Sequence, residues 1–259
     1  MIAEARVTVS GGPLRYLEAG SGWPVVFLHA FPLSADMWRP QLASVPEGFR
    51  FIALDLAGPH TSMDAIARDV GCALDELRID SAAIAGLSMG GYVAFAMFRL
   101  APERFDGLVL ADTRPQADTA EGRAGRLAMM ELVRRGGAAA VADQMLPKLL
   151  GDTTRRERPD VVAEVRRLIE ASSTKSIAAA IQAMLDRPDS TRDLQRVTCP
   201  ALVLAGEEDA ITPPSDAEAM SRLIPRALSV TLPRAGHLSN LEAPDEFSKA
   251  LADFLTARI

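Results

Sequence analysis

The stretch AGLSMGGYVA, residues 85–94, decides the fold expected for this chain. It places Ser88 between Gly86 and Gly90, where an apolar strand-like run gives way to a helix-like one. The pattern Gly-x-Ser-x-Gly on a strand-to-helix turn is the signature of a nucleophile elbow, a turn so sharp that larger residues beside the serine would collide with backbone. Ser88 is therefore a candidate nucleophile. The alternative is that Ser88 has only a structural role in the turn.

The sequence on both sides of this stretch alternates short apolar runs with helical patterns. Continuous apolar runs, typical of strands buried on both faces, occupy residues 24–30, 49–56, 82–88 and 108–113. Helical patterns begin near residue 34 and cover residues 62–78 and 91–100, and the same rhythm returns over 200–214, 216–223, 227–237 and 244–258. Such alternation predicts a mostly parallel, twisted sheet flanked by helices.

Two segments depart from this rhythm. Residues 1–20 favour an antiparallel hairpin, with residues 1–12 as an edge strand and not a signal peptide. Residues 115–197 contain no convincing strand and predict a helical insertion, with helices over 121–135, 138–150, 159–171 and 174–186. We therefore expect one core made of residues 1–114 and 198–259, interrupted by one helical domain.

Composition narrows the class of protein. Of the 259 residues, 48% are hydrophobic and 24% charged, with a formal net charge of −6, as in a globular enzyme. An acidic chain without a basic block has no electrostatic reason to bind nucleic acid or an anionic membrane. Cys72 and Cys199 lie far apart and outside any zinc-ligand pattern, so we expect reduced thiols in a cytoplasmic protein without a metal site.

A serine nucleophile needs a base, and the chain has three histidines. His237 lies in LPRAGHLSNLEAP, a loop after the last predicted strand, and it follows Ser88 as the chain order Ser…Asp/Glu…His requires. His29 ends an apolar run and is expected to be a core histidine satisfied by backbone hydrogen bonds. His60 lies in a polar, turn-like setting and is expected to be exposed. His237 is therefore the candidate base.

The acid that orients the base is expected between Ser88 and His237, at the end of a later strand. Asp209, in VLAGEEDAITPP, fits this position. Glu207 and Glu208 are rivals in the same run, and both also suit a loop solubilised by charge. Oxyanion-hole amides are expected from Met89, which follows the serine, and from Phe31, in the loop after the strand that ends near His29.

Four motifs in this order, HAFP, GLSMGG, GEEDAITPP and AGHLSNLEAP, resemble an α/β-hydrolase along the whole chain. Within that superfamily the chain resembles the 3-oxoadipate enol-lactonases and the cofactor-free haloperoxidase-like esterases. The resemblance implies Ser88 as nucleophile, His237 as base and Asp209 as its partner. It also implies that residues 115–197 form a cap over the serine. The segment 55–64 is shorter than in relatives, and Ala30 replaces the usual glycine of the oxyanion loop.

The expected chemistry is the hydrolysis of a small to medium carboxylic ester or lactone through an acyl-enzyme, without a cofactor. A perhydrolase or haloperoxidase-like reaction and carbon–carbon bond hydrolysis use the same three residues and stay open. A non-catalytic ligand-binding module is the remaining alternative. We expect an apolar substrate pocket, although each of its candidate residues also suits core packing. The candidates are Trp38, Met129, Met130, Met145 and Met184.

Overall fold

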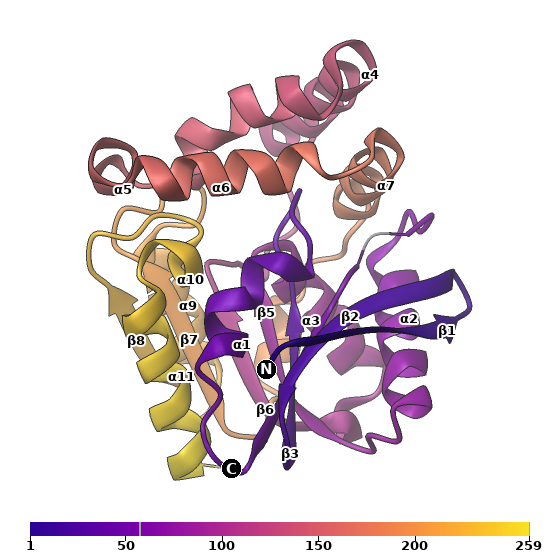
Figure 1. Cartoon of the computed structure of the whole chain (residues 1–259), viewed down its shortest axis with the longest axis vertical. Helices are drawn as coiled ribbons and strands as arrows, with labels where there is room; N and C mark the ends of the chain where they lie inside the picture. The colour runs from indigo at the N-terminus through magenta and orange to yellow at the C-terminus, as the bar shows by residue number, and fades with distance from the viewer. Residues whose placement is uncertain (57, 259) are drawn as a thin grey trace.

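A computed structural model describes residues 1–56 and 58–258 of the chain. Within them, eight strands form one sheet in the order β1-β2-β4-β3-β5-β6-β7-β8 (Figure 1). β2 runs antiparallel to its neighbours β1 and β4, and every other neighbouring pair is parallel. The strands are β1 (Ala3–Val9), β2 (Gly12–Gly20), β3 (Trp23–Leu28), β4 (Phe49–Leu54), β5 (Ala82–Leu87), β6 (Phe105–Ala111), β7 (Ala201–Gly206) and β8 (Leu228–Leu232).

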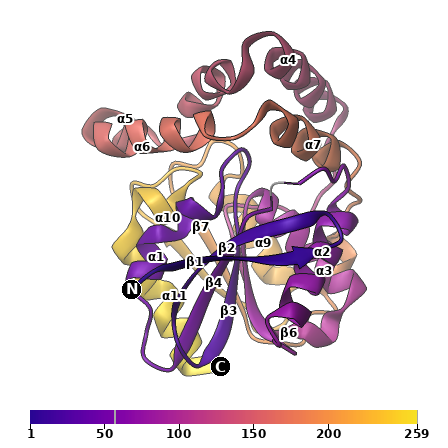
Figure 2. The same ribbon diagram turned by 45° about the vertical axis from the view of Figure 1, so that its right-hand side comes forward.

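Helices cover both faces of this sheet, as Figures 1 and 2 show. One face carries α1 (Arg39–Ala43), α10 (Ser239–Glu242) and α11 (Pro244–Arg258), and the other carries α2 (Met63–Glu76), α3 (Met89–Leu100), α8 (Thr191–Leu194) and α9 (Pro214–Leu223). Short 3-10 helices span Ala35–Trp38 and Pro102–Arg104. Because helices shield both faces, every residue of the central strands β5 and β7 is buried, which explains their continuous apolar runs.

Local sequence explains where the covering helices begin. α2 starts after Ser62, whose side-chain oxygen accepts a hydrogen bond from the backbone N–H of Ala65 at 3.2 Å. Ile66, Val70 and Leu74 then recur at helical spacing and are buried. α3 begins at Met89, two residues earlier than the sequence pattern predicts, because the turn at Ser88 needs no further residues.

Of the five α-helices between β6 and β7, the first four lie above the sheet, and we call them the helical layer (Figures 1 and 2). They are α4 (Ala120–Leu149), α5 (Asp152–Glu157), α6 (Pro159–Glu170) and α7 (Thr174–Leu185). Gly137, with φ 64°, breaks α4 into two helical parts between the predicted ranges 121–135 and 138–150. The short helix α5 was not expected, because its sequence DTTRRE carries no apolar periodicity.

No helix in the described residues is both long enough and apolar enough to cross a lipid bilayer.

Candidate active site

The backbone of Ser88 adopts an unusual conformation between β5 and α3. Its φ of 53° and ψ of −113° lie outside the regions that non-glycine residues favour. The neighbouring strand holds it there, because the N–H of Ser88 donates to the carbonyl of Ala111 at 2.9 Å and the hydroxyl of Thr113 donates to the carbonyl of Ser88 at 2.8 Å. Strain that surrounding bonds maintain is typical of functional sites.

The glycines around Ser88 are required by close backbone approach. A Cβ on Gly90 would collide with the carbonyl oxygen of Leu28, and a Cβ on Gly86 would collide with the carbonyl oxygen of Gly90. Backbone atoms cannot move away as a flexible side chain would. The Gly-x-Ser-x-Gly spacing therefore has the physical reason inferred from the sequence, and it places Ser88 at the N-terminus of α3.

The structure brings His237 to this serine from the loop between β8 and α10. Its Nε2 lies 2.8 Å from the Ser88 Oγ, although the two residues are 149 positions apart. Both side chains are buried. This distance is within hydrogen-bond reach, as the candidate nucleophile and the candidate base require.

Asp209 completes the contact from the loop after β7. Its Oδ2 lies 2.8 Å from the Nδ1 of His237 and accepts a hydrogen bond from the hydroxyl of Thr212 at 2.7 Å. Its Oδ1 accepts from the backbone N–H groups of Ile211 and Thr212 at 2.8 and 3.0 Å. Four donors therefore fix the carboxylate, and the Nδ1 of His237 is held as a donor to it.

The electrostatics of the pair follow from this contact. Burial favours the neutral imidazole, but the charge and hydrogen bond of Asp209 outweigh it and raise the pKa of His237 above its usual 6.5. Burial alone would raise the pKa of Asp209, yet His237 and the hydroxyl of Thr212 lower it below the usual value. Asp209 is thus held as a carboxylate beside a base of increased basicity.

The two rival acids have other partners. Glu208 accepts hydrogen bonds from the backbone N–H and the hydroxyl of Thr153, at 2.8 and 2.5 Å, and so links the core to the helical layer. Glu207 accepts from the backbone N–H of Arg234 at 3.1 Å. Of the three acids in the run, Asp209 is the one that contacts His237.

His29 is satisfied by the backbone, as expected. Its Nδ1 lies 2.9 Å from the carbonyl of Ala30, and its Nε2 accepts from the N–H of Leu56 at 2.9 Å. Burial lowers the pKa of His29, which keeps the ring neutral despite the charge of Asp55. Both ring nitrogens are occupied, so His29 has a structural role at the floor of the site.

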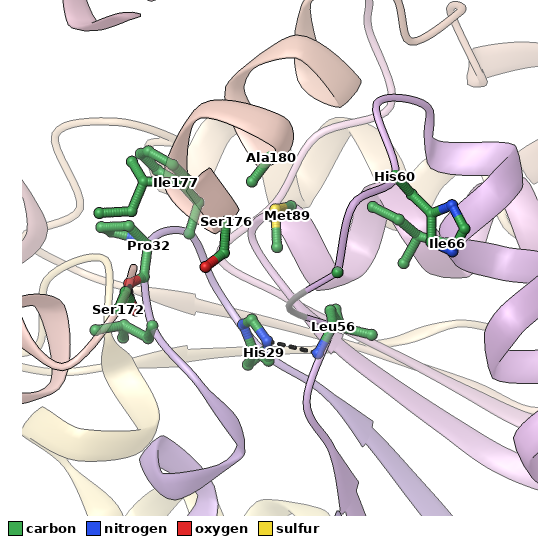
Figure 3. A pocket seen from close by; sticks show the side chains of 13 residues that line it. His29, Pro32, Leu56, His60, Ile66, Met89, Ser172, Ser176, Ile177 and Ala180 are labelled. Carbon is green, nitrogen blue, oxygen red and sulfur yellow. Dashed lines mark hydrogen bonds between the residues drawn. The ribbon is translucent and has the colours of Figure 1, made fainter. Parts of the chain in front are cut away.

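A small pocket, with a cavity volume of about 30 Å³, opens between the sheet and α7 (Figure 3). It is lined by Met89, which follows Ser88, but not by Ser88 itself. Phe31 and Met89, the expected oxyanion-hole residues, both line it. Figure 3 shows Ile177 and Ala180 of α7 on the side opposite His29 and Leu56. The remaining lining residues are Pro32, Leu33, Gly58, His60, Ile66, Ser172 and Ser176. The lining is mostly apolar, as in small-molecule sites.

The five residues expected to bind substrate are not among those that line this pocket. Trp38 is fully buried and stacks between Phe27 and Phe247, with ring centroids 4.9 and 5.9 Å apart, so it belongs to the core under the sheet. Met129 and Met184 are buried, and Met130 and Met145 half-buried, among the helices of the layer. The apolar wall comes instead from α7 and from the loop at Phe31.

His60 differs from its expected exposure. It is half-buried, its Nε2 lies 2.6 Å from the Oδ2 of Asp69, and it lines the pocket. It belongs to the short segment 55–64, of which Gly58 also lines the pocket, whereas residue 57 lies outside the described residues.

Three contributors to the site were missed by the sequence reasoning. Thr212 holds Asp209, Thr113 holds the backbone of Ser88, and Asp112 lies buried between the loops that carry the other residues. Each follows the carboxyl end of a parallel strand, where functional residues of open α/β sheets gather. Their position after a parallel strand is the sequence signal that could have identified them. Within the described residues, no group of three or more His, Cys, Asp or Glu side chains could hold a metal ion.

Comparisons with known proteins agree with this fold. A thermophilic esterase from Thermogutta terrifontis, solved with malate bound, superposes with a TM-score of 0.93 at 36% identity over 98% of both chains. The enol-lactonase from Burkholderia xenovorans LB400 superposes with a TM-score of 0.88 at 27% identity over 97% of this chain and 100% of the other. The 3-oxoadipate enol-lactonase 2 of Acinetobacter baylyi is 26% identical over 88% of this chain and 86% of its own length.

The family itself is shown by a match along most of the sequence. Residues 24–244 match the family model described as the alpha/beta hydrolase fold. The match covers the sheet from β3 to β8, the helical layer and the segments that carry Ser88, Asp209 and His237. The chain therefore belongs to the α/β hydrolase fold family.

Proposed function

We propose that this protein is a serine hydrolase that cleaves small to medium carboxylic esters or lactones through an acyl-enzyme. The observation that carries the proposal is the continuous contact from Asp209 through His237 to Ser88, with both hydrogen-bond distances at 2.8 Å. The similarity to an esterase and to enol-lactonases supports the same reaction class.

In the acylation step, the Oγ of Ser88 attacks the carbonyl carbon of the substrate while its proton passes to the Nε2 of His237. Asp209 keeps the Nδ1 of His237 protonated, so that the Nε2 is free to accept. The imidazolium then donates the same proton to the leaving alkoxide. Water enters, loses a proton to His237 and attacks the acyl-enzyme, which releases the acid and restores Ser88.

The tetrahedral intermediate carries an oxyanion that needs donors. The backbone N–H groups of Met89 and Phe31 are the donors that we assign to it. Met89 begins α3, so its N–H points out of the helix end together with the positive end of the helix dipole. Loss of one such donor typically lowers turnover about 10²- to 10³-fold.

The pocket defines the substrate class. Its cavity volume is small, about 30 Å³, which favours a short acyl or alcohol group over a bulky one. Its lining includes no Lys, Arg, Asp or Glu from the described residues. An uncharged substrate therefore avoids the cost of burying an unpaired charge. We assign the helical layer the role of a cap, because α7 supplies one wall.

The test is a substrate panel run on the wild type and on Ser88→Ala. It compares 4-nitrophenyl acetate, butyrate and octanoate, a small lactone, and a pair of methyl esters that differ in charge, methyl butyrate and monomethyl succinate. We expect hydrolysis of the short uncharged esters, weak hydrolysis of the succinate, and loss of turnover in Ser88→Ala. Turnover that persists in Ser88→Ala, or a wild type inactive on the whole panel, overturns the proposal.

A further inference from the structure

A fourth side chain joins the loops of the candidate active site without touching the pocket. Asp112 follows β6 and is almost fully buried. Its Oδ1 accepts a hydrogen bond from the N–H of Gly206 at 2.8 Å. Its Oδ2 accepts from the N–H and the hydroxyl of Ser239, at 3.3 and 2.5 Å. One carboxyl group therefore binds the end of β7 and the start of α10, which are separate in sequence and adjoin the loops that carry Asp209 and His237.

Each partner of Asp112 lies next to a reacting residue. Gly206 precedes Asp209 by three residues, and Ser239 follows His237 by two. The residues flanking Asp112 hold the third loop, since the carbonyl of Ala111 accepts from Ser88 and the hydroxyl of Thr113 donates to it. Asp112 thus lies where the serine, acid and histidine loops meet.

The backbone at Asp112 is also unusual. Within the described residues, five non-glycine residues have a positive φ. Arg78, Arg226 and Arg234 are exposed, whereas Ser88, with φ 53°, and Asp112, with φ 45°, are buried. A left-handed aspartate at the end of a buried strand costs conformational free energy that its side-chain bonds must offset. The two buried residues of this kind directly follow Leu87 and Ala111, which are paired in the neighbouring strands β5 and β6.

From these contacts we propose that Asp112 is a positioning residue that sets the mutual placement of Ser88, Asp209 and His237 by tying their loops together. This inference rests on the proposed hydrolase function. Asp112 does not line the pocket and hydrogen-bonds to none of Ser88, Asp209 and His237, so its positioning role runs through the bonds to Gly206 and Ser239.

The protonation state of Asp112 determines which substitution preserves this role. Burial, aided by the negative charge of Asp209, raises the pKa of Asp112 to about 8, although the charge of His237 and the bonds from Ser239 and Gly206 act against it. A neutral group therefore fits this site, provided that the contacts to Gly206 and Ser239 are kept. Asparagine is a neutral group of the same shape, whose oxygen accepts from Gly206 and whose NH₂ group donates to the hydroxyl of Ser239, which turns to accept.

The experiment measures kcat and KM for a short uncharged ester with three variants. Asp112→Ala removes both links, and since a misplacement of about 1 Å costs about 10²-fold, we expect kcat to fall about 10- to 100-fold with KM unchanged. Asp112→Asn is expected to recover kcat to within about threefold of the wild type, because it keeps one link to each loop. Ser239→Ala loses the shortest link and is expected to lower kcat about three- to tenfold, again with KM unchanged.

A matched control separates positioning from loss of a buried polar contact in general. Gln41 is fully buried and its amide binds the carbonyl and side chain of Asn240 in α10, at 3.1 Å each, next to Ser239. Gln41→Ala therefore weakens the anchoring of the same helix without breaking a link between the loops. We expect its kcat to equal that of the wild type, with circular dichroism confirming that each variant is folded.

The outcomes are distinct. A folded Asp112→Ala with wild-type kcat overturns the inference, and so does a Gln41→Ala with an equal loss of kcat. If Asp112→Ala does not fold, the other two variants decide. The inference is then overturned if Ser239→Ala keeps the wild-type kcat, or if Asp112→Asn loses as much kcat as Ser88→Ala. A wild type that hydrolyses no ester overturns the proposed function, which is a different result from an active wild type whose kcat does not depend on Asp112.

Discussion

Asp209→Asn is the substitution whose effect the hydrogen bonds specify most fully. In the wild type the Oδ1 of Asp209 accepts from two backbone N–H groups, those of Ile211 and Thr212. A side-chain amide can satisfy these donors only with its oxygen, so the NH₂ group of asparagine must turn toward the Nδ1 of His237. The imidazole is then forced to accept at Nδ1 and to carry its proton on Nε2, where it can no longer accept the proton of Ser88.

The size of the effect follows from that tautomer. The corresponding substitution in serine proteases lowers kcat about 10⁴-fold, which corresponds to about 5 kcal/mol of activation free energy. We expect a similar loss here, with little change in KM, because Asp209 does not line the pocket. The assay is steady-state hydrolysis of a 4-nitrophenyl ester, with the fold of each variant verified by circular dichroism.

The control is Glu208→Gln, one residue away. A glutamine amide can accept from the N–H of Thr153 and donate to its hydroxyl, so both contacts of Glu208 survive and the histidine is untouched. We expect turnover close to that of the wild type. If Asp209→Asn keeps turnover within tenfold of the wild type while Glu208→Gln loses it, the assignment of the acid is refuted.

Further outcomes follow from the same geometry. Because catalysis needs a neutral His237 whose pKa is raised above 6.5, kcat/KM should fall as the pH drops through a value above 6.5, and a profile that is flat from pH 5 to 8 would contradict a histidine base. Because Trp38 is a core residue, Trp38→Ala should lower the free energy of unfolding, measured by urea titration, by about 3–5 kcal/mol and leave KM unchanged. A raised KM would instead indicate that Trp38 contacts the substrate. Ile177→Ala should raise KM for short esters, while Met145→Ala should not. Equal KM values in the two variants would contradict the assignment of Ile177 to the pocket wall.

The fold was predictable because two signals agreed along the chain. Continuous apolar runs marked strands buried on both faces, and the spacing around Ser88 required a turn that only glycines permit. Chain order then led to His237 and Asp209, since the loops after parallel strands meet at one edge of the sheet. The boundaries of α3 and β6 differed from expectation by two or three residues, where a helix or strand continues through residues with no distinct pattern.

The pocket was not predictable in the same way. The methionines of the helical layer recur at helical spacing, which describes a buried face but not whether that face meets a core or a cavity. Trp38 was predicted to line the pocket as one of several apolar residues, yet two aromatic side chains, Phe27 and Phe247, pack against it in the core. Ile177 and Ala180 reach the pocket because the helical layer folds back over the sheet, and this long-range placement leaves no trace in local sequence.

The central claim is that Ser88 is a nucleophile activated by His237, and covalent labelling tests it most directly. A phosphonofluoridate probe reacts by forming a bond between the serine Oγ and phosphorus, with loss of fluoride and transfer of the serine proton to the base. Peptide mass spectrometry of the labelled protein should place one adduct on Ser88, and His237→Ala should react far more slowly. An adduct on another residue, or no adduct on a protein that hydrolyses esters, would contradict the account.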